Sequence, residues 1–199
     1  CALLRHAGMA VICGTLPPGV PENLWARLAA AAQQRGVPLV IDSHGAPLLR
    51  TLACEPLLAK MTVRELEKTF GILCRNGRDI VAAARRLTAA GARWALITHG
   101  ARPAILVGRE GDGWQVSPPA VAVVSPIGSG DCVNAGVVHA RMRGASMLEA
   151  VRLGIGCGSA NARTIRPADF CVSEARQLAA ASRARPLPQL TAPTRAGRR

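Results

Sequence analysis

Short, uninterrupted apolar runs alternate with helix-like stretches through the first half of the chain. Four runs predict strands, at residues 9–13, 37–42, 57–60 and 93–98. Four amphipathic stretches predict helices, at residues 21–35, 46–53, 63–70 and 79–90. Strands that are apolar at every position are typical of a parallel sheet with helices on both faces. The sequence therefore predicts an α/β fold with a mostly parallel sheet.

The pattern changes after Gly100. Two short runs, Ala104–Gly108 and Gly113–Val116, predict a hairpin, and Val121–Val124 predicts one more strand. Helices are expected at residues 132–142, 147–163 and 173–181. We expect a single domain over residues 1–182, followed by a basic, disordered tail over residues 183–199, which holds proline and arginine but no acidic residue.

Composition narrows the class of protein. Of 199 residues, 49% are hydrophobic, which is enough for one buried core, and no apolar run is long enough to span a bilayer. The net charge of +13 suggests nucleic acid, but arginines are scattered and aromatic residues make up only 3%, so we expect neither a nucleic-acid nor a membrane partner. Seven cysteines without a CxxC pair indicate reduced thiols and a cytoplasmic location.

The segment Gly128–Asp131, with the sequence GSGD and here called the anion turn, stands before a predicted helix. Glycine permits close approach of the backbone to a ligand, and the free N–H groups of a helix start favour an anion such as phosphate. A carboxylate at Asp131 fits a general base that takes a proton from an attacking hydroxyl. The alternative is a tight turn in which Asp131 only caps the helix.

Further polar residues follow the predicted strands, where ligands bind in open α/β sheets. They are Thr15, Asp42, Lys60 and Thr98–Gly100, and one cleft could hold them together with the anion turn. The sequence has neither a Walker A loop nor a GxGxxG fingerprint, which argues against a P-loop NTPase and a dinucleotide enzyme.

Several motifs, in order, resemble the ribokinase/PfkB carbohydrate kinases, and most closely their sugar-phosphate branch. The resemblance covers roughly residues 10–178. The matching segments are Cys13–Pro21 (CGTLPPGVP, like SGSLPPGVP), Val40–Gly45 (VIDSHG, like VVLDTSG), Lys60–Leu66 (KMTVREL, like KPNxxEL), Thr98–Gly100 (THG, like SLG), Ser125–Asp131 (SPIGSGD, like NPxGSGD) and Gly158–Ala162 (GSANA, like GxANA).

The resemblance implies a ribokinase-like fold and an ATP-dependent kinase that acts on a sugar phosphate with Mg²⁺. It makes Asp131 the general base, and it makes the N–H groups of Gly128, Ser129 and Gly130 the anion hole. Residues expected near the nucleotide are Lys60, Thr62, Thr98, Gly100, Ser159 and Asn161. Gly14 and Thr15 are expected to border the sugar phosphate, and Glu65 to position Mg²⁺ through water.

The sequence also departs from the family pattern. Thr62 replaces the usual asparagine of KPNxxE, Pro103 replaces a glycine, and Arg166 stands where a glycine is frequent. The family's first strands and its β lid over the sugar are expected to be missing. Two hypotheses follow: a sugar-phosphate kinase that forms a homodimer in its full-length form, or a non-catalytic nucleotide-binding remnant. The sequence does not select among fructose 1-phosphate, fructose 6-phosphate and tagatose 6-phosphate.

Overall fold

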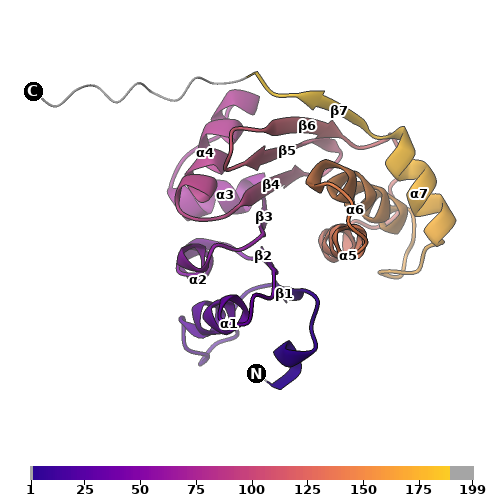
Figure 1. The fold of residues 1–199 in the computed structure, drawn as a ribbon. Coiled ribbons are helices and arrows are strands. Elements are labelled where there is room, and N and C mark those ends of the chain that lie inside the picture. The colour runs from indigo at the N-terminus through magenta and orange to yellow at the C-terminus, as the bar shows by residue number, and fades with distance from the viewer. Residues whose placement is uncertain (1, 189–199) are drawn as a thin grey trace, which may run out of the picture.

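A computed structural model describes residues 2–188 and shows one seven-stranded sheet with helices on both faces (Figure 1). The strands lie side by side in the order of the sequence. They are β1 (Ala10–Cys13), β2 (Leu39–Asp42), β3 (Leu58–Thr62), β4 (Trp94–His99), β5 (Arg102–Gly108), β6 (Gly113–Ser117) and β7 (Arg183–Pro186). The α/β fold with helices on both faces of one sheet, expected from the sequence, is confirmed.

The sheet is parallel from β1 to β4 and antiparallel from β4 to β7. A helix-containing connection joins each parallel pair, whereas β4 and β5 are joined by a two-residue turn. Gly100 opens that turn with φ +58°, a left-handed conformation that matches the twist of a hairpin. The predicted strands at the start of the chain are therefore confirmed, and so is the predicted hairpin, which β5 and β6 form.

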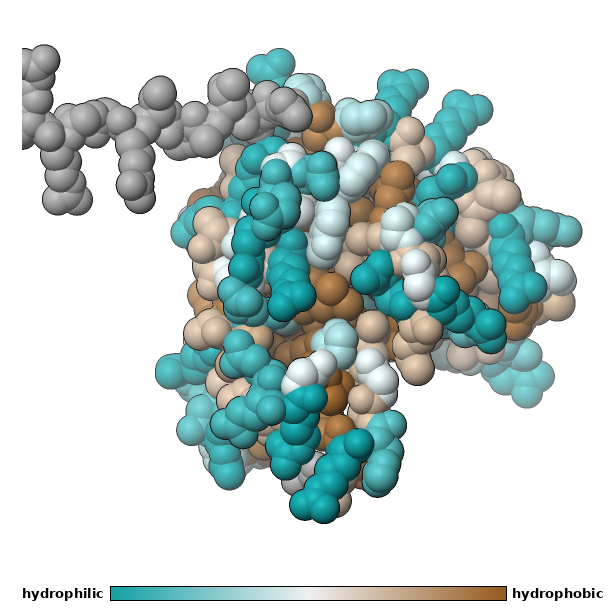
Figure 2. Space-filling view, in the orientation of Figure 1, coloured by the Kyte–Doolittle hydropathy of each residue, from teal (hydrophilic) through white to brown (hydrophobic). Residues whose placement is uncertain are grey.

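The helices form two layers. One layer contains α1 (Leu24–Gln33), α2 (Gly45–Leu49), α3 (Val63–Phe70) and α4 (Gly77–Ala89), and the other contains α5 (Ser129–Met142), α6 (Met147–Ala162) and α7 (Val172–Ala181). Short 3₁₀ helices occupy Ala2–Arg5 and Leu52–Cys54. Figure 2 shows hydrophilic side chains over the outer surfaces of both layers, with apolar side chains visible between them.

Neighbouring residues of one strand pack into hydrophobic cores on opposite faces of the sheet, because side chains alternate across a sheet. Ile41 packs with the α1–α4 layer, and its neighbour Val40 packs with α5 and α6. Both are fully buried, so the apolar runs in the sequence reflect a sheet that is covered twice.

Glycines bring α5 and α6 unusually close. A Cβ atom on Gly136 would lie 2.7 Å from Cα of Gly154, and one on Gly154 would lie 2.6 Å from the carbonyl oxygen of Val133. Both distances are shorter than a carbon atom tolerates. This close packing fixes α5, and with it the anion turn, against α6.

Two sequence-based expectations were wrong. Val121–Val124 is not a strand: Val123 and Val124 are each 56% exposed, and the backbone N–H of Val124 donates to Ala162 at the end of α6. The predicted tail begins too early, because Arg183–Pro186 forms edge strand β7 against β6. Residues 189–199 of that tail lie outside the described residues. No helix in residues 2–188 has the length and apolarity needed to cross a membrane.

Candidate active site

The anion turn starts helix α5. Gly128 is the N-cap with φ +78°, a conformation that favours glycine, and a Cβ there would lie 2.9 Å from Cβ of Pro167. No side chain caps the helix, so the prediction that Asp131 only acts as a cap is wrong. The first-turn N–H groups lack an intrahelical partner, although that of Ser129 donates to the carbonyl of Pro126 at 3.2 Å. Asp131 is exposed within that turn. This arrangement offers amide donors beside a carboxylate.

Asn161, fully buried near the end of α6, holds the anion turn from below. Its Nδ2 donates to the carbonyl of Ile127 at 2.8 Å and to Oγ of Ser129 at 2.9 Å. Its Oδ1 accepts from the backbone N–H of Ala168 at 2.7 Å. The sequence predicted a nucleotide contact for this residue, whereas in the structure its side chain joins the anion turn to the segment that follows α6.

A buried polar pair joins Asp42, the last residue of β2, to Lys60 in the neighbouring strand β3. The Lys60 ammonium donates to Oδ2 of Asp42 at 2.5 Å, and the side chains are 3% and 16% exposed. A Cβ on Gly130 would lie 3.3 Å from Nζ of Lys60. The lysine therefore places positive charge directly beneath the start of α5, where an anion would be bound.

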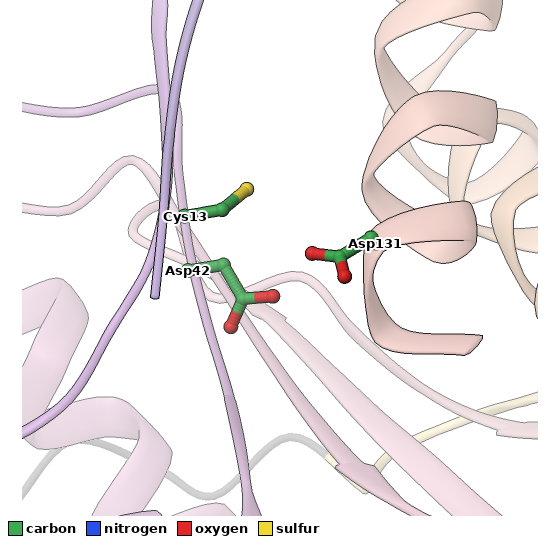
Figure 3. A group of neighbouring side chains, drawn as sticks. All are labelled: Cys13, Asp42 and Asp131. Atoms are coloured by element: carbon green, nitrogen blue, oxygen red, sulfur yellow. The ribbon is translucent and has the colours of Figure 1, made fainter. Parts of the chain in front are cut away.

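Cys13, Asp42 and Asp131 converge between the sheet and α5. One ligand atom from each lies within 4.8 Å of the others. Figure 3 shows the side chains from β1 and β2 directed toward Asp131 on the helix. Burial, and then the negative charges of Asp42 and Asp131, raise the pKa of the Cys13 thiol. The thiol therefore stays protonated at neutral pH.

Asn134 is the residue of this site that the sequence analysis missed. It lies one turn after Asp131 on α5, is 2% exposed, and donates through Nδ2 to Asp42 at 2.7 Å and to Sγ of Cys13 at 3.4 Å. Its Oδ1 is buried without a hydrogen-bond partner. A polar residue within the otherwise apolar stretch at residues 132–138 of the helix, three positions after the candidate base, was the available signal.

The predicted metal residue Glu65 belongs to a capping box on α3. Its Oε2 accepts from the N–H of Thr62 at 2.7 Å and from the Thr62 hydroxyl at 2.8 Å. The other oxygen, Oε1, lies 3.6 Å from Nδ1 of His44. The Thr62 hydroxyl is therefore hydrogen-bonded at the start of α3. The Oε1 atom of Glu65 is not bonded to Thr62 and faces His44.

The proposed sugar side contains a pocket of about 460 Å³. Thr15 and His44 line it, together with the loop Leu16–Val20. Gly14, with φ +92°, donates its N–H to the carbonyl of Asp42 at 2.9 Å, which ties this loop to the end of β2. The pocket therefore adjoins the polar cluster through β1 and β2.

The remaining predicted nucleotide residues lie on neighbouring elements. Thr98 is the second-last residue of β4, where its hydroxyl is 3.5 Å from the carbonyl of Met61, and Gly100 lies in the turn to β5. Ser159 is buried on α6. At the adjacent Gly158, a Cβ would lie 3.1 Å from the carbonyl of Ser129, so α6 contacts the anion turn closely.

Comparison with known proteins gives the family. The family model described as "pfkB family carbohydrate kinase" matches residues 1–174. The chain belongs to this family. Among curated PfkB relatives, a 1-phosphofructokinase of Rhodobacter capsulatus is 34% identical over 142 residues, which are 71% of this chain and 45% of that protein. ATP-dependent 6-phosphofructokinase isozyme 2 of Escherichia coli K12 is 31% identical over 79% of this chain and 51% of its own length.

Solved PfkB structures share the fold. Phosphofructokinase-2 from Escherichia coli, in complex with potassium, superimposes with a TM-score of 0.80 at 29% identity, covering 87% of this chain and 57% of that one. The chain spans about half the length of the curated relatives that it matches.

Proposed function

We propose that the chain carries the phosphoryl-transfer site of an ATP-dependent sugar-phosphate kinase. The observation that carries the proposal is the anion turn: uncapped first-turn N–H groups at the start of α5, with Asp131 exposed beside them. Relatives named as 1-phosphofructokinase and 6-phosphofructokinase support the class of substrate.

In the proposed mechanism, Asp131 accepts the proton of a sugar hydroxyl as its oxygen attacks the γ-phosphorus of ATP. The bond between the γ-phosphorus and the bridging oxygen breaks, and ADP leaves. The N–H groups of Gly128, Ser129 and Gly130 stabilise charge on the transferring phosphoryl group, and the Lys60 ammonium beneath them adds positive potential. Asp42 fixes the position of that ammonium, and Asn134 in turn fixes the position of the Asp42 carboxylate.

The nucleotide is proposed to lie between the anion turn and the end of β4. Thr98, Gly100 and Ser159 border that region on β4 and α6. Mg²⁺ would neutralise phosphate charge and be held mainly by the phosphates. Glu65 fits a role through water, because Thr62 occupies only one of its carboxylate oxygens.

The acceptor is proposed to be fructose 1-phosphate, fructose 6-phosphate or tagatose 6-phosphate, bound beside Gly14 and Thr15. A homodimer is proposed for the full-length protein; a solved phosphofructokinase-2 of Escherichia coli is described as a tetrameric inhibited form. A second candidate is a nucleotide-binding protein without turnover. The observation that favours it is the set of departures from the family motifs at Thr62, Pro103 and Arg166.

A coupled ADP-release assay with each of the three sugar phosphates tests the proposal. Asp131→Asn should lower turnover by about 10²–10⁴, the usual contribution of general-base catalysis, and leave ATP affinity within a few-fold. Asp112→Asn, at an exposed turn between β5 and β6, is the matched control and should leave both unchanged. Retained turnover in the Asp131 variant would remove it as the base. ATP binding without sugar-dependent ADP release in the wild-type chain would favour the second candidate.

A further inference from the structure

Edge strand β7 carries two exposed arginines, Arg183 and Arg185. Within residues 2–188, neither of them takes part in an ion pair. In the ladder with β6 they lie opposite Ser117 and Gln115. Side chains alternate across a sheet, so all four residues point to the same face. One face of the edge formed by β6 and β7 is therefore polar and basic.

This face continues the one that α4 covers farther along the sheet. Gln115 pairs with Ile105, which belongs to the core under the α1–α4 layer, whereas Val116 packs with α5 and α6 on the other face. α4 packs against β4 and β5, and a hollow of about 540 Å³ lies between its first turn and Gln115. The polar face of β6 and β7 is therefore left open to solvent.

A second hollow, of about 520 Å³, lies over the arginines. Its lining includes Gln115, Ser117, Arg183 and Arg185, and the segment 118–120 forms one of its walls. Gln115 lines both hollows, so the two adjoin each other as one groove. No acidic residue lines either of them. The groove therefore favours a partner with negative charge.

β7 also offers backbone groups to a further strand, because it is the last strand in the sheet order. The N–H of Leu187 donates to the carbonyl of Gly113 at 2.9 Å. N–H groups alternate in direction along a strand, so the N–H and the carbonyl of Ala184 face away from β6. Pro186 faces the same way but has no N–H group. The free edge therefore fits one short strand centred on Ala184.

We propose that this edge binds an extended segment of another protein in which two acidic residues are separated by one residue. The middle residue exchanges two backbone hydrogen bonds with Ala184, as in an antiparallel pair. The residues before and after it then lie opposite Arg185 and Arg183, with their side chains on the groove face. Each carboxylate pairs there with a guanidinium, a geometry that allows two parallel hydrogen bonds.

No extended segment of this sequence has the required acidic spacing. Acidic residues two positions apart occur at Glu65 and Glu67, in helix α3, and at Glu110 and Asp112, around the turn between β5 and β6. No acidic residue follows Glu174 in the sequence. The proposed partner is therefore neither a second copy of the described fold nor residues 189–199.

The start of β7 is held in place before any partner binds. Ser182 is buried, and Arg152 on α6 donates through Nε to its hydroxyl at 3.1 Å and through Nη2 to its carbonyl at 3.1 Å. A receptor strand that is already ordered loses less entropy on binding. Charged side chains and proline also protect a sheet edge from unwanted pairing. The test must therefore show that the edge accepts an acidic strand.

The test measures peptide binding to the 199-residue chain by fluorescence anisotropy. The probe is a labelled, capped peptide, Thr-Val-Glu-Val-Glu-Val-Thr, and the control peptide is Thr-Val-Val-Glu-Glu-Val-Thr. Both have the same composition, so the net charge of +13 attracts them equally. Adjacent glutamates point to opposite faces of a strand, so the control can pair with only one arginine. We expect the probe to bind about threefold or more tightly than the control, the contribution of one exposed ion pair.

Variants locate the binding to β7. Arg183→Gln combined with Arg185→Gln should weaken probe binding by about tenfold, since two ion pairs are lost, and should abolish the preference for the probe. Arg27→Gln combined with Arg143→Gln removes two exposed arginines elsewhere and is the matched control. It should lower the affinity for both peptides alike and keep the preference. Ala184→Pro, which removes the free N–H, should also weaken probe binding.

Equal affinity of the wild-type chain for the two peptides would overturn the proposal, because a general polyanion surface would bind both alike. Absence of binding would do the same and would leave the arginines a protective role. A preference that survives the double change at Arg183 and Arg185 would also contradict it. The measurement requires neither nucleotide nor sugar phosphate, so its outcome is independent of the proposed function.

Discussion

Replacing Asn161 with alanine should destabilise the fold by removing the side chain that joins the anion turn to the segment after α6. Four hydrogen bonds are lost: those with Ile127, Ser129 and Ala168, at 2.8, 2.9 and 2.7 Å, and a weak one from the buried Cys132 thiol at 3.5 Å. A typical internal hydrogen bond contributes about 0.5–1.5 kcal/mol net. Water can reach the exposed loop residues Ile127 and Ala168 after the change and replace part of the lost bonding. We therefore expect the free energy of unfolding to fall by about 2–3 kcal/mol.

Urea unfolding followed by circular dichroism measures this loss as a lower midpoint at unchanged slope. Asn23→Ala is the matched control: Asn23 is exposed, makes no side-chain capping bond to α1, and should change stability by less than about 0.5 kcal/mol. Equal midpoints for the two variants would show that Asn161 does not hold the turn.

Asn161→Asp adds a test with a defined pH dependence. The introduced carboxyl would be buried and face the carbonyl of Ile127, so its pKa in the folded state is raised above the unfolded value. A protonated carboxyl can still donate to that carbonyl, whereas a carboxylate cannot. The loss of stability relative to wild type should therefore be large at pH 8 and shrink toward pH 4, and a loss that is independent of pH would argue against this geometry.

Two further predictions concern charged and thiol groups near the site. Lys60→Met leaves Asp42 without its buried partner and should cost about 3–5 kcal/mol in a urea unfolding experiment, whereas Lys68→Met at an exposed position should cost little; equal midpoints would contradict the buried pair. At pH 7, iodoacetamide should label Cys171 before Cys13, because hydrogen bonds at the start of α7 lower the pKa of Cys171 while burial raises that of Cys13. Peptide mapping by mass spectrometry decides this order, and faster labelling of Cys13 would count against it.

The parallel half of the fold could be predicted from local sequence, because a doubly covered strand is apolar at every position. Residues 39–41 and 94–97 show this pattern and lie in β2 and β4. The failure at Val121–Val124 has a physical cause. β6 already pairs with β5 and β7, so no free side of β6 is left for this apolar run, and the end of α6 binds its backbone instead.

The sequence analysis missed β7 because this strand lacks an apolar pattern. Arg183–Pro186 is polar and contains proline, so nothing local favours a strand. An edge strand needs only one pairing partner and tolerates proline where the ring faces away from the ladder. The pairing of Pro186 with Trp114 joins residues far apart in the sequence, and local periodicity does not report such pairing.

The site was predictable as a set of strand ends but not as a network. Asp42, Lys60 and Asp131 were expected in one cleft, and the structure brings them together beside Gly130. The role of Asn161 could not be predicted from its motif. The same sequence would fit an asparagine that contacts a ligand and one whose buried amide binds the anion turn. Only the observed bonds to Ile127 and Ser129 distinguish them.

The central claim, that the anion turn binds nucleotide phosphates, is tested most directly by a calorimetric ATP titration of two glycine variants. Gly128 and Gly144 flank α5 with φ values of +78° and +84°, so alanine at either position costs about 1–2 kcal/mol of backbone strain. A Cβ at Gly128 would also meet Pro167 at 2.9 Å, whereas one at Gly144 meets nothing within 4 Å.

We therefore expect wild type and Gly144→Ala to bind Mg²⁺–ATP with the same affinity. Gly128→Ala, which displaces the N–H groups of the turn, should bind more than about tenfold more weakly, the equivalent of one lost charge-assisted hydrogen bond of about 1.5–3 kcal/mol. Equal ATP affinity in Gly128→Ala and Gly144→Ala, or no binding by the wild-type chain, would show that the turn is not a nucleotide site.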